Sequence, residues 1–124
     1  HIEVTPVPFE KLSDDRKGED STLIRERVIA ARKIQAERFD ALEDIHYNAQ
    51  MGTKLIRKFC PLGEDSKQLL KNAMKRLNLS ARAYDRILKV SRTIADLENV
   101  VEINTNHISE AIQYRSLDRE GWLG

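Results

Sequence analysis

The spacing of the apolar residues from position 21 onward is the feature that most constrains this fold. These residues recur at steps of three and four, the period of an amphipathic α-helix, and Gly, Pro, Asn and Ser interrupt the pattern at short intervals. The pattern predicts helices over residues 21 to 39 or 41, 53–59, 64–77, 81–97 and 105–115. Amphipathic helices with short connections bury their apolar faces by packing on one another. We therefore expect a mainly α fold, a small bundle of about five helices.

The first twenty residues do not follow this pattern. Residues 1–4 alternate like a β-strand, Pro6 and Pro8 favour an extended segment over a helix, and residues 10–20 are charged and typical of a loop. A single short strand has no partner within the chain, so we expect the chain to be cut from a larger protein. The predicted division is the end of a preceding core and a linker at 1–20, a helical domain at 21–118 and a tail at 119–124.

The composition excludes several classes of function. The hydrophobic fraction is 40%. The net charge is only +1, so any anion-binding site must come from local clustering of basic residues. The single cysteine, Cys60, excludes an intramolecular disulfide and favours a reducing, cytoplasmic compartment. No apolar run approaches the roughly 18 residues that a membrane helix needs, and no signal peptide is recognisable, so no membrane partner is expected.

The sequence predicts neither a metal centre nor a catalytic constellation. His1, His46 and His107 do not stand at metal-ligand spacing with one another or with Cys60, and we expect Cys60 and His107 to be structural residues. The glycines are scattered and no GK[ST] motif occurs, so the chain has no phosphate loop. On its own the chain is therefore not expected to be an enzyme or to hold a metal or cofactor.

Arg82 stands in an unusual position, near the start of the helix predicted over residues 81–97. Ser80 is a good N-cap, but a cation in the first turn opposes the helix dipole by roughly 0.3–1 kcal/mol. Exposed N–H groups and a guanidinium at a helix start form a phosphate site. The alternative is a simple ion pair between Arg82 and Asp85, one turn further along the helix.

The same helix carries further basic residues. Arg86 and Lys89 share a face with Arg82, and Arg92 is displaced to its side. Such a stripe is either a surface for nucleic acid or nucleotide, or an ordinary solvated face. Tyr84 is the only aromatic residue nearby, and the apolar period places it in the core.

Several stretches of the sequence together resemble one known family. They are LSARAYDRILKV at residues 79–90, RTIADL at 92–97, HI at 107–108, EAIQYR at 110–115, IRERV at 24–28 with Gln35, RF at 38–39, NAQM at 48–51 and HIEV at 1–4. The set resembles the C-terminal domain of the magnesium-chelatase-like AAA+ ATPases, most closely their ComM competence-protein branch. The similarity covers nearly the whole chain, and the motifs are specific as a set although each is weak alone.

The resemblance implies a role for this chain within a larger protein. In that family an α/β core, whose last strand residues 1–4 resemble, carries the phosphate loop and the magnesium-holding acids. A helical lid then adds a sensor arginine, and Arg82 is the matching residue. Its guanidinium is expected to reach the γ-phosphate of ATP, and loss of that phosphate to free the lid. Arg86 and Lys89 are expected to be auxiliary contacts to phosphate or to a neighbouring subunit.

The resemblance also implies cofactors and partners. ATP and Mg²⁺ belong to the intact parent, and the expected partners are its own ATPase core and neighbouring subunits in a hexameric ring. DNA, processed during competence by branch migration, is the expected substrate of the parent. The residues by themselves leave two other functions open, a stand-alone nucleic-acid-binding module on the basic stripe and a protein-assembly module.

Overall fold

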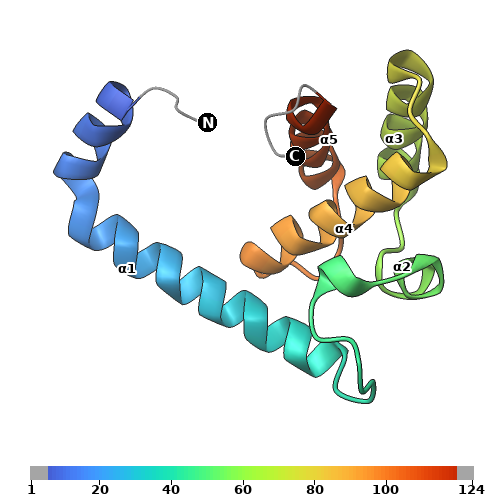
Figure 1. Ribbon diagram of the computed structural model, residues 1–124, viewed down its shortest axis with the longest axis horizontal. Helices are drawn as coiled ribbons and strands as arrows, with labels where there is room; N and C mark the ends of the chain where they lie inside the picture. Colours follow the sequence, from blue (N-terminus) through green and yellow to red (C-terminus); the bar gives the residue numbers. More distant parts are fainter. Residues whose placement is uncertain (1–5, 120–124) are drawn as a thin grey trace.

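The computed structural model describes the backbone of residues 6–119 and the side chains of residues 21–114. Over this range the chain is mainly α, as predicted, with five α-helices and one short 3₁₀ helix (Figure 1). Their bounds are α1 (Pro6–Arg38), η1 (Asn48–Gln50), α2 (Thr53–Phe59), α3 (Glu64–Leu77), α4 (Ala81–Leu97) and α5 (Thr105–Arg119). A parallel β-bridge between Leu62 and Ile103 is the only strand-like pairing in the described residues.

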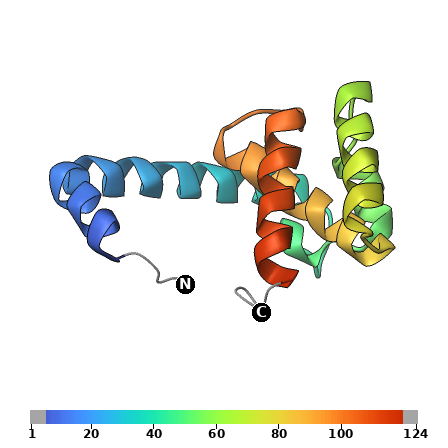
Figure 2. The same ribbon diagram turned by 90° about the horizontal axis from the view of Figure 1, so that it is seen from above.

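The helix α4 lies at the centre of the bundle. It packs against α1, α2, α5 and η1, while α3 packs against α5. Figure 2 shows α3 and α5 side by side, with α1 leading away from the bundle as a long arm. Because α4 touches four other elements, residues along its length can connect distant parts of the chain.

The hydrophobic core lies where α2, α3, α4 and α5 meet. Leu70 of α3, Ile87 of α4 and Ile108 of α5 are at most 1% exposed. Burial of each such side chain stabilises the fold by about 1.5–3 kcal/mol. On the side of α1, the Phe39 ring packs edge-on against Phe59 with 5.6 Å between ring centroids, which closes the core at the end of the arm.

Short polar residues set the ends of the helices, as the sequence predicted. Asn78 ends α3 in the left-handed conformation with a φ of 52°. Ser80 begins α4, and its hydroxyl accepts a hydrogen bond from the Ala83 N–H at 3.2 Å. The predicted bounds of α2, α3 and α4 are all confirmed.

The N-terminal part of α1 differs from the sequence prediction. Pro6 and Pro8 had indicated an extended segment and residues 10–20 a loop, but α1 begins at Pro6 and runs through all of them. Both prolines fall in the first turn of the helix, where the N–H groups have no intrahelical acceptor, so the missing N–H groups cost nothing. The strand predicted for residues 1–4 and the tail with Trp122 lie outside the described residues.

Tyr84, which the apolar period placed in the core, is exposed, and so are Ile24 and Tyr114, which stand at apolar positions of their helices. Ile24 is 52% exposed, Tyr84 37% and Tyr114 43%. The helix α1 has 33 residues and is about 50 Å long (Figure 1). At Ile24 it borders an open groove with Ile94 and Leu97 of α4, so the side chain is covered only in part. Despite this length, none of the described helices is apolar enough to cross a membrane.

Candidate functional site

Arg82 lies in the first turn of α4, where the sequence placed it. Ser80 caps the helix, no acidic residue occupies the first turn, and the Arg82 side chain is exposed. Within the described part of the chain, this guanidinium makes no hydrogen bond and no ion pair. Its charge therefore faces the positive end of the helix dipole without compensation from the described residues.

Asp85, the nearest acidic residue, is engaged elsewhere. Its Oδ2 accepts a hydrogen bond from the hydroxyl of Thr53 in α2 at 3.0 Å. The ion pair between Arg82 and Asp85, which was the alternative to a phosphate site, is not formed. The contact between Thr53 and Asp85 instead joins the start of α4 to the start of α2.

Of the other basic residues of α4, Arg86 continues the exposed stripe, whereas Lys89 and Arg92 do not. Arg86 is exposed one turn beyond Arg82. Lys89 Nζ donates a hydrogen bond to the backbone carbonyl of Ala49 in η1 at 3.2 Å. Arg92 is only 5% exposed and belongs to the interior. The part of the nucleic-acid hypothesis that rested on Arg92 is therefore wrong, because η1 and α1 cover this half of α4.

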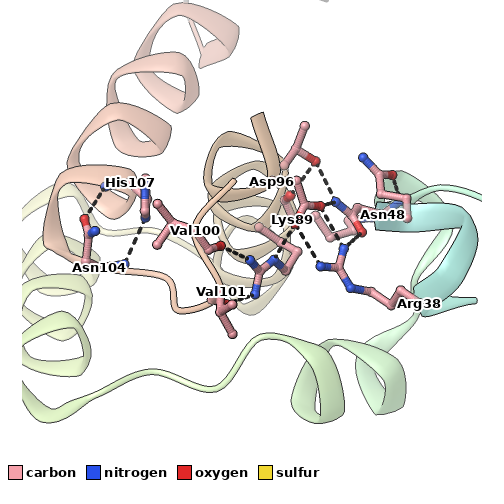
Figure 3. A network of polar contacts seen from close by, with 11 residues as sticks. Arg38, Asn48, Lys89, Asp96, Val100, Val101, Asn104 and His107 are labelled. Atoms are coloured by element: carbon pink, nitrogen blue, oxygen red, sulfur yellow. Dashed lines mark hydrogen bonds and ion pairs between the residues drawn. The ribbon is translucent and has the colours of Figure 1, made fainter. Parts of the chain in front are cut away.

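The C-terminal half of α4 carries a buried polar network (Figure 3). Asp96 is 1% exposed, and each of its carboxylate oxygens accepts a hydrogen bond from Arg38 of α1 at 2.8 Å. The Asn48 amide of η1 donates to the same carboxylate at 2.8 Å and accepts from Arg38 at 2.8 Å. One carboxylate thus holds together α1, η1 and α4, three segments that are far apart in the sequence.

Asn48 completes the network from the side of η1. The second hydrogen of its side-chain amide is donated to the Thr93 hydroxyl at 3.0 Å, and its backbone N–H donates to Gln35 Oε1 at 2.8 Å. Asn48 is 1% exposed, so these bonds replace all the water contacts that its side chain loses on folding. Hydrogen bonds from one buried side chain to several segments favour one arrangement of the segments that they join.

Arg92 approaches the Asp96 carboxylate from the other direction. Its Nε lies 3.2 Å from Asp96 Oδ1, within ion-pair distance but without hydrogen-bond geometry. Its terminal nitrogens donate to the carbonyls of Val101 at 2.9 Å and Val100 at 3.0 Å, which fixes the connection between α4 and α5. Burial lowers the pKa of Arg92, and the negative charge of Asp96 offsets part of this effect.

Cys60 and His107 are structural residues, as predicted. Cys60 is buried, and burial raises the pKa of its thiol to about 11, which leaves it protonated and unreactive at neutral pH. The buried His107 accepts a hydrogen bond at Nδ1 from the Asn104 N–H at 3.0 Å. Its proton therefore sits on Nε2, which donates to Glu98 Oε1 at 2.9 Å and ties α5 to the end of α4.

Comparison with known proteins assigns this domain to a family. The family model described as "Magnesium chelatase, subunit ChlI C-terminal" matches residues 18–115. The chain belongs to this family. The match includes Arg82 and the whole buried network around Asp96, so both ends of α4 lie within the magnesium-chelatase C-terminal domain.

Curated relatives agree with the family. The competence protein ComM of Haemophilus influenzae is 41% identical over 119 residues, which are 95% of this chain and 22% of that protein. An uncharacterized protein, YifB of Salmonella typhimurium, is 42% identical over 103 residues, 83% of this chain and 19% of the relative. The uncharacterized protein Rv2897c of Mycobacterium tuberculosis is 32% identical over 99 residues, 79% of this chain and 19% of the relative. The chain spans about a fifth of the length of these relatives.

The magnesium-chelatase C-terminal domain has two notable sites on α4, and only one of them was singled out from the sequence. The network around Asp96 was missed. The sequence did contain a signal for a buried ion pair. Arg38 directly precedes the buried Phe39, Asp96 directly follows the buried Ala95, and the two charges are opposite. Among the described residues, no group of three or more His, Cys, Asp or Glu residues is arranged to hold a metal ion.

Proposed function

We propose that this chain is the helical lid of a larger magnesium-chelatase-like AAA+ ATPase and that Arg82 is its nucleotide-sensing residue. The observation that supports this best is an exposed guanidinium, without a partner among the described residues, in the capped first turn of α4. A phosphate bound there would turn an unfavourable charge into a favourable one. Because the chain has no phosphate loop, Arg82 serves a site whose other parts lie in the parent protein, and the chain itself is not catalytic.

The proposed chemistry is electrostatic. A guanidinium donates two parallel hydrogen bonds to phosphate oxygens in a fixed geometry, and the γ-phosphate of ATP spreads its charge over such oxygens. Arg82 would report whether the γ-phosphate is present and would stabilise the charge that moves during phosphoryl transfer. ATP and Mg²⁺ are the cofactors of the parent in this proposal, and Arg86 is an auxiliary contact to phosphate or to a neighbouring subunit.

The helix α4 offers a path from the phosphate to the rest of the domain. Arg82 and Asp96 are separated by fourteen residues, which is about 21 Å along a helix. Asp96 is bonded at 2.8 Å to Arg38 of α1 and to Asn48 of η1. If Arg82 moves with the γ-phosphate, α4 moves as well and shifts α1, to which it is bonded. The position of the long helix α1 would then depend on which nucleotide is bound.

The role of the parent is proposed from its relatives. One relative is named a competence protein, and the family is named after magnesium chelatase. We infer that the parent is a cytoplasmic protein that forms a hexameric ring and acts on DNA, which it processes by branch migration during competence. In the ring the lid contacts its own ATPase core and a neighbouring subunit, and Lys89, bonded to Ala49, stays within the lid.

The test is ATP hydrolysis by the intact parent carrying Arg82→Ala. We expect turnover to fall about a hundredfold, the effect of removing one charge-stabilising donor, while Arg82→Lys restores only part of it because lysine lacks the fork of donors. Arg76→Ala, at an exposed arginine in the last turn of α3, is the matched control and should hydrolyse ATP normally. Wild-type turnover in Arg82→Ala would refute the assignment.

A further inference from the structure

The charge of this chain is concentrated in one region although the total is only +1. Residues 53–89, which include α2, α3 and the first half of α4, contain ten basic and three acidic residues. Residues 90–114 contain one basic and four acidic residues. The side of the bundle formed by α2 and α3 (Figure 1) therefore has a positive potential that attracts polyanions.

The lysine face of α3, which consists of Lys67, Lys71 and Lys75, is the most regular part of this charge. The three residues are spaced by four, so they lie along one side of α3 about 6 Å apart, and all three are exposed. Lys67 is 4.0 Å from the exposed Glu64, whereas the side chains of Lys71 and Lys75 pair with no other described residue. Like charges at this spacing destabilise a helix, so helix stability does not explain them.

A groove with an apolar floor lies beside the lysine face, between α2, α3 and α4. Its volume is about 610 Å³, Met74 and Leu88 are among its apolar residues, and Arg57 and Lys67 stand at its edge. The groove and the lysine face therefore share Lys67. Tyr84, which the apolar period had placed in the core, lines this groove and is 37% exposed.

We propose that this surface binds a single-stranded nucleic acid, with phosphates along the lysine face of α3 and one base in the groove against Tyr84. A row of cations at regular spacing suits the regularly spaced phosphates of a strand. Every base has a π-face that an aromatic side chain can stack on, so the site tolerates many sequences. This site rests on the proposed function, which makes DNA the substrate of the parent, and it adds the surface that would hold the strand. It uses none of the residues assigned to nucleotide sensing.

Other polyanions fit this surface less well. In a duplex the bases are paired and stacked, so a base enters the groove only after it is flipped out. An acidic polypeptide can pair with the lysines but brings no base to stack on Tyr84. An anionic membrane is excluded as the main partner because Leu70 and Ala73, on the apolar face of α3, are at most 1% exposed and cannot insert.

The first test measures binding of a fluorescent 20-nucleotide oligo(dT) to the 124-residue chain by anisotropy over a range of salt concentrations. In the variant Lys67→Gln/Lys71→Gln/Lys75→Gln, the slope of log K against log salt should become shallower by about 2, or about 0.7 for each lost phosphate contact. The matched control Arg25→Gln/Arg32→Gln/Lys33→Gln removes the same charge from exposed positions of α1 and should keep the slope. Equal losses in both variants, or a wild-type slope near zero, would overturn the proposal.

The second test addresses the groove. Tyr84→Leu should weaken oligo(dT) binding about tenfold, Tyr84→Phe should bind like the wild type because it keeps the ring, and an abasic strand should not distinguish the three. Tyr114→Leu, at an equally exposed tyrosine of α5, is the control and should have no effect. If Tyr84→Leu binds oligo(dT) normally, or a 20-base-pair duplex binds as tightly as the single strand, the proposed base site is wrong.

A third measurement separates nucleic acid from acidic protein. Polyglutamate at the same charge concentration should displace oligo(dT) poorly, and displacement as efficient as by unlabelled oligo(dT) would make the ligand an acidic polypeptide. Circular-dichroism melting should show that each variant remains folded, since every substituted side chain is exposed. ATP hydrolysis does not enter any of these readouts, so this proposal and the role of Arg82 fail independently.

Discussion

The two ends of α4 carry the same kinds of charged residue in opposite environments. At the N-terminal end Arg82 is exposed and has no partner among the described residues. At the C-terminal end Arg92 and Asp96 are 5% and 1% exposed, and Asp96 is bonded to α1 and η1. The difference arises because α1 and η1 cover only the second half of the helix. A charged side chain in the uncovered half of α4 is available to a ligand. In the half that α1 and η1 cover, a charged side chain instead joins these segments to the helix.

The comparison predicts its largest effect at Asp96. Asp96→Ala leaves Arg38 and Arg92 without their shared anion, and loss of one partner from a buried ion pair costs about 3–5 kcal/mol. Asp85→Ala, at the other end of the helix, removes only a hydrogen bond from Thr53 and should cost about 1 kcal/mol or less. Urea unfolding followed by circular dichroism measures both.

The two aspartate variants should differ clearly in the free energy of unfolding that they lose. Asp96→Asn serves as a second variant, because it keeps the shape and some hydrogen bonds while removing the charge, and it should fall between the other two. Equal losses for Asp96→Ala and Asp85→Ala would mean that the network contributes no more than a surface contact.

The buried end also predicts a dependence of stability on pH. Burial raises the pKa of the Cys60 thiol from 9.0 to about 11, although the charges of Arg92 and Arg38 act in the opposite direction. Above pH 9 the unfolded chain releases this proton while the folded chain keeps it, so the free energy of unfolding falls as the pH rises towards 11. The loss should be about 2 kcal/mol by pH 10.5.

Urea unfolding of the wild type and of Cys60→Ala at pH 8 and pH 10.5 isolates this group. Lysines and tyrosines titrate in both proteins, so only the difference between the two pH dependences belongs to Cys60. The variant should lack about 2 kcal/mol of the wild-type decrease. Identical pH dependences would contradict an elevated pKa in the folded state.

Much of the fold follows from local sequence. The apolar period and the capping residues Asn78 and Ser80 determine where α3 ends and α4 begins, because both act within a few residues of the chain. The beginning of α1 was not predicted, because proline is unfavourable inside a helix and acceptable in its first turn. The pattern around Pro6 does not distinguish these two cases.

The candidate sites were predictable to different degrees for a related reason. Arg82 could be singled out because its anomaly, a cation in a capped first turn, is local. Burial of Arg92 and exposure of Tyr84 depend on which elements cover α4, and this is decided by residues about forty or more positions away, such as Asn48. Periodicity identifies the faces of a helix, but it does not say which half of a face another segment covers.

The smallest effect is predicted at the exposed end, and its sign is informative. Arg82→Ala should raise the free energy of unfolding by about 0.3–1 kcal/mol, because the substitution removes a cation that opposes the helix dipole. Ser80→Ala, two residues earlier, removes the cap and should lower it by about 1 kcal/mol. Urea unfolding at low ionic strength resolves the two, and added salt should reduce the effect at Arg82 but not at Ser80. Destabilisation by Arg82→Ala would mean that this side chain has a partner within the fold. The proposal that Arg82 is available to bind a phosphate would then be wrong.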